Sequence, residues 1–156
     1  MILRILRGPA LIAATLPAGV IAWLALHPAP PPLNKPLFAG AQIDQPTLAL
    51  FQRACQNCHS ANTQWPWYSQ IPPTSFLVRK DVDQARRHAN FSNWDSYRPD
   101  EQQDLLSRIG SVARSGQMPL PRYTWLHREA ILTTEERQQI YEWTRGERKR
   151  LRRIAP

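Results

Sequence analysis

Residues 55–59 read Cys55-Gln56-Asn57-Cys58-His59 and contain both cysteines of the 156-residue chain. A C-x-x-C-H box is the attachment signature of a c-type haem. Two thiols at this spacing can each bond one vinyl group of the same porphyrin, and the histidine that follows is held beneath the iron as its proximal ligand. The motif therefore predicts one haem c, attached covalently through Cys55 and Cys58, with His59 as an axial ligand of the iron.

Two other kinds of site also use closely spaced cysteines. A thioredoxin-like dithiol needs a βαβ context, which is not recognisable in this sequence. A zinc site would need a fourth ligand besides Cys55, Cys58 and His59, and there is no second cysteine pair to supply it. The sequence favours covalent haem and leaves the zinc site and the thiol redox pair as alternatives.

The apolar pattern around the box is helical. Leu48, Phe51, Cys55 and Cys58 recur at spacings of three and four residues, which predicts a helix over 46–58 with both thiols on one apolar face. Such a face suits two bonds to a single porphyrin.

Three further helices are predicted over 74–89, 100–115 and 133–150, the last one beginning at a capping box from Thr133 to Glu136. Their expected buried residues are Val78, Val82, Ala85 and Ala89, then Leu105, Ile109 and Val112, then Ile140 and Trp143. No stretch alternates polar and apolar residues long enough to propose a sheet, so the body is predicted to be all-α. Its connecting loops are rich in Trp, Tyr and Pro, and we expect a haem at the centre to supply the core that the helices alone lack.

Met118 is the candidate for the second axial ligand. It is the only methionine besides the initiator and lies in Gly116-Gln117-Met118-Pro119-Leu120-Pro121, where the prolines restrict the backbone. Thioether sulfur is a soft ligand that favours ferrous haem iron. An ordinary core methionine is the alternative role for this residue, and His88 and His127 are competing ligands.

Aromatic residues follow the haem box closely. Trp65, Trp67 and Tyr68 belong to the run Trp65-Pro66-Trp67-Tyr68. Their faces could pack on the porphyrin while an indole or phenol hydrogen bonds a propionate. Simple filling of the core around this loop is the equal alternative.

The first 27 residues are typical of a membrane anchor or a signal segment. Arg4 and Arg7 precede an uncharged apolar stretch from Pro9 to Leu26, which is just long enough to cross a bilayer as a helix. A good cleavage site is not apparent after it, so we expect an uncleaved single-pass helix, with a cleaved signal peptide as the alternative. The basic residues orient the N-terminus toward the cytoplasm. The rest of the chain would then lie on the periplasmic side of a bacterial cytoplasmic membrane.

A proline-rich segment separates this anchor from the body. Residues 28–36 contain five prolines in nine positions and favour an extended, polyproline-like conformation. The predicted organisation is therefore an anchor or signal segment at 1–27, a linker at 28–40, a haem-binding domain at 41–146 and a basic tail at 147–156.

The formal net charge of +8 is concentrated at the ends of the chain, chiefly the C-terminal one. Residues 37–143 carry eleven basic and eleven acidic side chains, whereas the last thirteen residues carry six basic and one acidic. An exported chain is a poor candidate for nucleic-acid binding despite this basic run. We expect the tail to contact anionic lipid or an acidic redox partner, or to be a solvated helix end whose cations oppose the helix dipole.

Five sequence elements follow one another in a fixed order: Cys55–Ser60, Trp65–Tyr68, Ile71–Pro73, Asn90–Trp94 and Gly116–Pro119. Together they resemble the small bacterial haem-binding domain family, over about residues 40–146. The resemblance implies a cytochrome-c-like helical domain around one haem, often behind an N-terminal transmembrane helix. It does not imply a particular partner or pathway.

From these features we predict a membrane-tethered monohaem c-type cytochrome that transfers single electrons outside the cytoplasmic membrane and is not an enzyme. Its redox partner is unknown. A haem-based peroxidase-like enzyme, or a gas or redox sensor with a labile sixth ligand, is the alternative.

Overall fold

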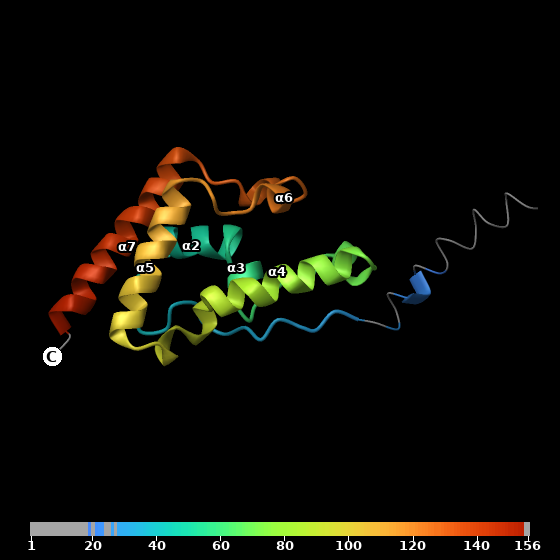
Figure 1. The fold of residues 1–156 in the computed structure, drawn as a ribbon, viewed down its shortest axis with the longest axis horizontal. Helices are drawn as coiled ribbons and strands as arrows, with labels where there is room; N and C mark the ends of the chain where they lie inside the picture. Colours follow the sequence, from blue (N-terminus) through green and yellow to red (C-terminus); the bar gives the residue numbers. More distant parts are fainter. Residues whose placement is uncertain (1–18, 20, 24–25, 27, 155–156) are drawn as a thin grey trace, which may run out of the picture.

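The computed structural model describes residues 19, 21–23, 26 and 28–154. In this part of the chain there are helices and loops but no β-strands, so the predicted all-α class is confirmed for it. The helices that follow residue 40 are α2 (Gln45–Ala54), α3 (Gln56–His59), η1 (Trp67–Gln70), α4 (Thr74–His88), η2 (Phe91–Ser96), α5 (Pro99–Arg114), α6 (Pro121–Thr124), η3 (Arg128–Ala130) and α7 (Thr134–Ile154). Figure 1 shows α5 and α7 side by side at one end of the domain, with α4 extending toward the other end.

The helix predicted over 46–58 is divided at Cys55. This residue has φ −125° and ψ −32°, outside the usual α-helical values, and it separates α2 from α3. The single-helix prediction is therefore wrong at Cys55. Because α3 is a separate turn, it packs against α4 as well as against α2, and the second half of the haem box is held between these two helices.

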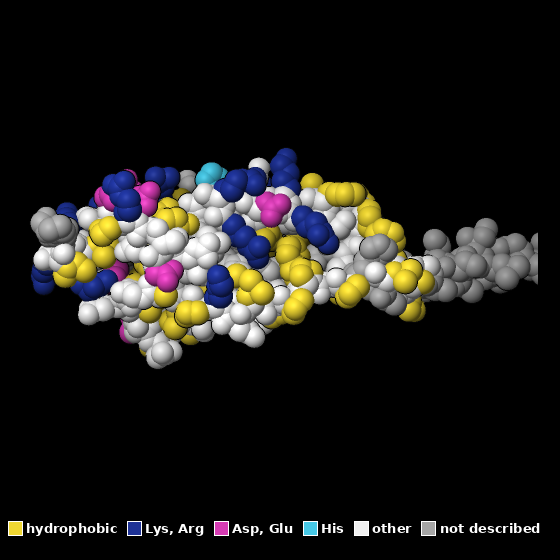
Figure 2. All heavy atoms as spheres, turned by 90° about the horizontal axis from the view of Figure 1, so that it is seen from below, with side chains coloured by type: hydrophobic (Ala, Val, Ile, Leu, Met, Phe, Trp, Pro, Cys, Tyr) yellow, Lys and Arg dark blue, Asp and Glu magenta, His cyan; other side chains and the backbone are white. Residues whose placement is uncertain are grey.

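α4 lies where the sequence predicts a helix. Val82 is buried, and Val78 and Ala85 are half-buried, which agrees with the predicted apolar stripe. Phe76 and Leu77 are instead 69% and 63% exposed, although both are large and apolar. In Figure 2, hydrophobic side chains gather on the surface toward the end to which α4 extends.

α5 and α7 are the most extensively packed helix pair. Gly110 permits their close approach, because a Cβ atom at this position would overlap the buried Thr144 side chain. Leu106 and Gly110 are buried, whereas Ile109 and Val112, predicted to point inward, are half-buried. The buried face of α5 is thus rotated from the predicted one toward the helix contact at Gly110.

We expect Gly110→Ala to destabilise the protein by about 1–3 kcal/mol, since the new methyl group would overlap Thr144. Gly146→Ala is the matched control. Gly146 lies in α7, and a Cβ atom at this position would meet no other atom within 4 Å. This second substitution should stabilise the helix by about 0.5–1 kcal/mol. Denaturant unfolding of both variants measures the difference, and a similar change in the two would contradict the close contact.

α7 begins at the predicted capping box. The Thr133 N–H donates to Glu136 Oε2 at 2.9 Å, and the Glu136 N–H donates to Thr133 Oγ1 at 3.2 Å. The helix continues to Ile154 rather than ending near residue 150. Most of the segment predicted as a tail, 147–156, is therefore the last part of α7.

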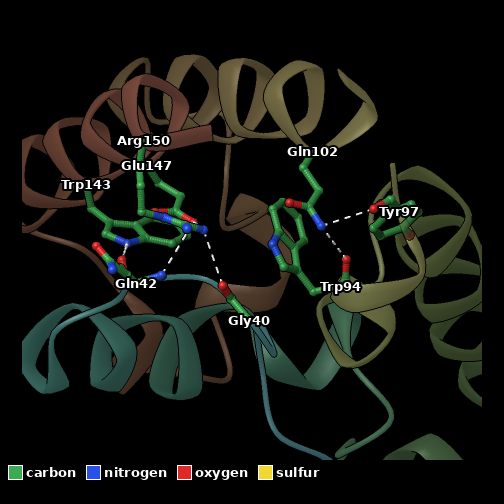
Figure 3. Close-up of polar contacts among 8 residues, drawn as sticks. All are labelled: Gly40, Gln42, Trp94, Tyr97, Gln102, Trp143, Glu147 and Arg150. Carbon is green, nitrogen blue, oxygen red and sulfur yellow. Dashed lines mark hydrogen bonds and ion pairs between the residues drawn. The ribbon is translucent and has the colours of Figure 1, made fainter. Parts of the chain in front are cut away.

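Polar contacts join residues 40–42, where the predicted linker meets the predicted haem-binding domain, to α7 (Figure 3). Trp143 Nε1 donates to Gln42 O at 2.8 Å, and the buried Glu147 accepts the Gln42 N–H at 3.4 Å. Arg150 pairs with Glu147 at 2.5 Å and donates to Gly40 O at 3.2 Å. The chain around residues 40–42 is thus fixed to α7 by contacts far apart in sequence.

The hydrophobic core is built largely from aromatic rings. Phe38 is 1% exposed, and its ring centroid lies 4.5–5.0 Å from those of Phe51, Phe91, Trp94 and Trp143. Phe38 belongs to the segment predicted as a linker, so the end of that segment is part of the packed domain. These rings give the domain an aromatic core formed by its own side chains, in addition to the core that the sequence predicts a haem to supply.

The predicted membrane anchor, residues 1–27, lies mostly outside the described residues, which include only 19, 21–23 and 26 of it. In the described part of the chain, no helix has both the length and the apolar character needed to span a bilayer.

Candidate haem site

The haem box folds as one tight turn after α2. The Cys55 carbonyl accepts hydrogen bonds from the N–H groups of Cys58 at 3.2 Å and His59 at 3.0 Å. All three side chains are half-buried, so they are sheltered while part of each remains accessible. The structure therefore keeps both thiols and the imidazole within a single turn at the junction of α2 and α4.

The imidazole of His59 is held by two neighbours. Its Nδ1 lies 3.0 Å from Ala89 O, and its ring stacks on Phe91 with a centroid separation of 5.1 Å and an angle of 15°. Burial lowers the pKa of His59, which favours the neutral ring. A neutral imidazole that donates its Nδ1–H to a carbonyl keeps its Nε2 lone pair for a metal, as metal-ligating histidines usually do. This geometry fits a haem iron bound by His59.

The two thiols are not poised for redox chemistry of their own. Burial raises the pKa of Cys55 to about 12, with the nearby Cys58 as the next cause. Burial also raises the pKa of Cys58 to about 11, followed by the charge of Asp81. Reactive dithiols have lowered pKa values, so these groups do not support the thioredoxin-like alternative.

The zinc alternative gains no support either. Among the described residues, His, Cys, Asp and Glu side chains form no group of three that could hold a metal ion. Cys55, Cys58 and His59 are near one another in the turn, but their donor atoms do not converge as a zinc site requires.

The predicted aromatic residues are dispersed. Tyr68 is close enough to Cys58 for the thiolate charge to raise the pKa of the phenol, after burial as the main cause. Trp65 is half-buried with Arg79 Cζ 6.0 Å from its ring centroid, and Trp67 is 67% exposed. The structure thus brings Tyr68 to the haem box and leaves Trp67 at the surface.

His127, a predicted rival ligand, has both ring nitrogens engaged. The Tyr68 hydroxyl lies 2.7 Å from Nε2, and Glu129 Oε1 lies 3.0 Å from Nδ1. In this arrangement neither nitrogen is left for an iron. His88, the other rival, is exposed at the end of α4.

Sequence reasoning missed the residues that join the loop after α5 to the haem box. Tyr123 stacks on His127 at 4.2 Å between centroids, and its hydroxyl accepts from Asn57 Nδ2 at 3.0 Å. Arg122 pairs with Asp81 of α4 at 2.7 Å. Asn57 lies inside the haem box, and its amide could have suggested a polar neighbour, but nothing local to residue 123 identifies the partner.

Met118 lies in that same loop. Gly116 ends α5 with φ +74°, and the Met118 N–H donates to Val112 O at 3.3 Å. The Met118 side chain is half-buried. Arg122 and Tyr123 belong to α6, directly after this loop, and their contacts attach the end of the loop to α4 and to α3, the helix that ends at His59.

The sequence is similar to the cytochrome c peroxidase Ccp of Escherichia coli (strain K12), with 29% identity over 103 residues. The match covers 64% of this chain and 22% of the relative, so the chain spans about a fifth of that protein's length. Similarity to an enzyme contradicts the prediction that the chain has no enzymatic activity. Among the solved structures, none matches the chain.

The family comparison covers a longer part of the chain. Residues 20–146 match the haem-binding domain family. The matched region contains the turn with Cys55, Cys58 and His59 and the loop with Met118, and it identifies haem as the cofactor. On this match, the chain belongs to the haem-binding domain family.

Proposed function

We propose that the chain binds one haem c covalently and exchanges single electrons outside the cytoplasmic membrane. The observation that carries the proposal is the position of His59. Its Nδ1 lies 3.0 Å from Ala89 O, which leaves Nε2 for an iron in the same turn as Cys55 and Cys58. When bound, the haem supplies a ferric/ferrous couple that takes up or gives up one electron.

The residues of the box have separate tasks in this proposal. Cys55 and Cys58 would each hold the haem by one thioether bond, formed by addition of the S–H group across a vinyl group, so attachment would need no oxidant. The Ala89 carbonyl fixes the tautomer of His59 and increases its basicity as a ligand. Met118 would be the second residue to bind the iron, and its soft sulfur would favour the reduced state.

Tyr68 is the best placed of the three aromatic residues to border the porphyrin. It is near Cys58 and its hydroxyl already bonds His127, so the ring is held at one orientation. Trp65 and Trp67 would contribute apolar contact if they close over the haem, and the exposure of Trp67 leaves room for such a contact.

The membrane location rests on the sequence. Arg4 and Arg7 followed by the apolar stretch Pro9–Leu26 support an uncleaved anchor with the haem domain on the periplasmic side. We expect the mature protein to fractionate with the membrane and to retain its N-terminus. Sequencing of its N-terminus decides the matter: a start at or beyond residue 28 would replace the anchor by a signal peptide.

Peroxide reduction is the second candidate function, and the similarity to a cytochrome c peroxidase favours it. Because the match spans about a fifth of that relative, the chain could act as an electron-transfer domain in such a reaction or reduce peroxide at its own haem. The second possibility requires a sixth coordination site that opens.

Optical spectra of the haem-loaded protein test both functions. For an electron-transfer domain we expect a six-coordinate reduced form that does not bind carbon monoxide. Rapid carbon monoxide binding together with peroxide-dependent oxidation of the reduced protein would favour peroxidase activity. Protein that takes up no haem in the presence of haem-attachment machinery would contradict the proposed function.

A further inference from the structure

A hollow of about 590 Å³ lies between α5 and α7 and opens to solvent. Its α5 wall carries Ser107, Ser111 and Ser115, which recur every four residues and so share one face of the helix. The volume is in the range of small-molecule sites, although this hollow is more polar than most of them. None of the residues assigned to the haem site lines it.

Three arginines border the hollow. Arg114 and Arg145 both contact the ring of Tyr141, with their Cζ atoms 4.6 Å and 5.7 Å from its centroid. These cation–π contacts restrain two guanidinium groups and leave N–H donors free to bind a ligand. No acidic residue lines the hollow. In the part of the chain that the structure describes, Arg114, Arg145 and Arg148 form no ion pair.

Arg148 has an unsatisfied guanidinium group beside the hollow. Its Nε atom is buried and has no hydrogen-bond partner among the described residues. Burial of an unpaired charged donor is costly, and native proteins usually avoid it. The terminal Nη atoms of the same guanidinium group are not buried in this way, so they are the donors that an acceptor in the hollow would reach.

We propose that the hollow binds a phosphate group, either free in solution or in a phospholipid headgroup. Guanidinium groups match the geometry of phosphate oxygens, and the serine hydroxyls can donate further hydrogen bonds. The C-terminal end of α5 carries a partial negative charge, which disfavours a bound anion. The attraction for phosphate must therefore come from the three arginines. We call this site, formed by Arg114, Arg145 and Arg148, the arginine cradle. It does not depend on the haem function.

The test uses the intact, haem-loaded chain in neutral detergent micelles. In one arm inorganic phosphate is added, and in the other the micelles receive phosphatidylglycerol in a phosphate-free buffer, with phosphatidylcholine for comparison. The ¹⁵N resonance of Arg148 Nε is followed by NMR. We expect a saturable shift in at least one arm, and the arm with the stronger binding identifies the source of the phosphate.

Arg148→Gln should weaken this binding about tenfold or more, because it removes a charge-assisted hydrogen bond. Arg145→Gln should weaken it similarly and serves as a second variant, since Arg145 is exposed and its loss should not affect folding. In both variants the remaining arginine signals report binding. Arg153→Gln is the matched control, because it removes the same charge from α7 outside the hollow. Absence of saturation in both arms, or an equal loss in Arg153→Gln, would overturn the proposal.

Discussion

Replacement of Cys55 and Cys58 together by serine is expected to abolish covalent haem attachment. A serine hydroxyl does not form the thioether bonds, and these are the only two cysteines in the chain. Serine is close to cysteine in size and both positions are half-buried, so the fold should persist. Extraction into acidic acetone, followed by haem staining of the denatured protein, measures the covalent fraction, which should fall from nearly all of the haem to none.

Single substitutions provide the control for this experiment. Cys55→Ser and Cys58→Ser each leave one thiol, so each variant should retain some haem that resists extraction. If acidic acetone extracts the haem from the unmutated protein, the thioether bonds are absent. The haem would then be held by His59 and apolar contacts alone, and the covalent part of the proposed function would be wrong.

The helices that the sequence predicts well are those whose signals are local. The capping box from Thr133 to Glu136 forms as expected, because both of its hydrogen bonds join residues three positions apart. The stripe of Val78, Val82 and Ala85 likewise follows from helical spacing within one element. Such patterns depend on neighbours in sequence, so they can be read without knowledge of the fold.

Features that depend on distant parts of the chain were missed. The role of Phe38 follows from rings up to 105 positions away, such as Trp143, whereas the proline-rich sequence before it places it in the predicted linker. The buried face of α5 depends on Gly110 meeting Thr144 of α7. No local pattern encodes either contact, and both change which residues form the core.

The candidate site shows the same division. The haem box identifies Cys55, Cys58 and His59 directly, because the chemistry requires them within five consecutive residues. The carbonyl that orients His59 belongs to Ala89, at the end of α4. Every residue has a backbone carbonyl, so the sequence cannot indicate which one accepts this hydrogen bond. Similarly, the bond between Tyr68 of η1 and His127, just before η3, joins residues 59 positions apart.

Substitution of Met118 by leucine is expected to have the second-largest effect on the haem site, smaller only than that of replacing both cysteines. Leucine keeps the approximate volume and removes the sulfur, so the loop should stay folded. If Met118 ligates the iron, the ferric protein should lose its weak far-red sulfur-to-iron band and the ferrous protein should begin to bind carbon monoxide. The reduction potential should fall by roughly a tenth of a volt or more, within the range of about 0.8 V that axial ligands set. Optical spectra and a redox titration measure these changes.

Two further variants separate ligation from disturbance of the loop. Met118→His should keep six-coordination and also lower the potential, because imidazole favours ferric iron relative to a thioether. His127→Ala should leave the far-red band in place, since both nitrogens of His127 are already engaged by Tyr68 and Glu129. A far-red band that survives Met118→Leu would contradict the assignment, because the only other methionine is the initiator. Avid carbon monoxide binding by the unmutated ferrous protein would mean that the sixth site opens without mutation, and it would favour peroxide reduction at this haem over electron transfer through it.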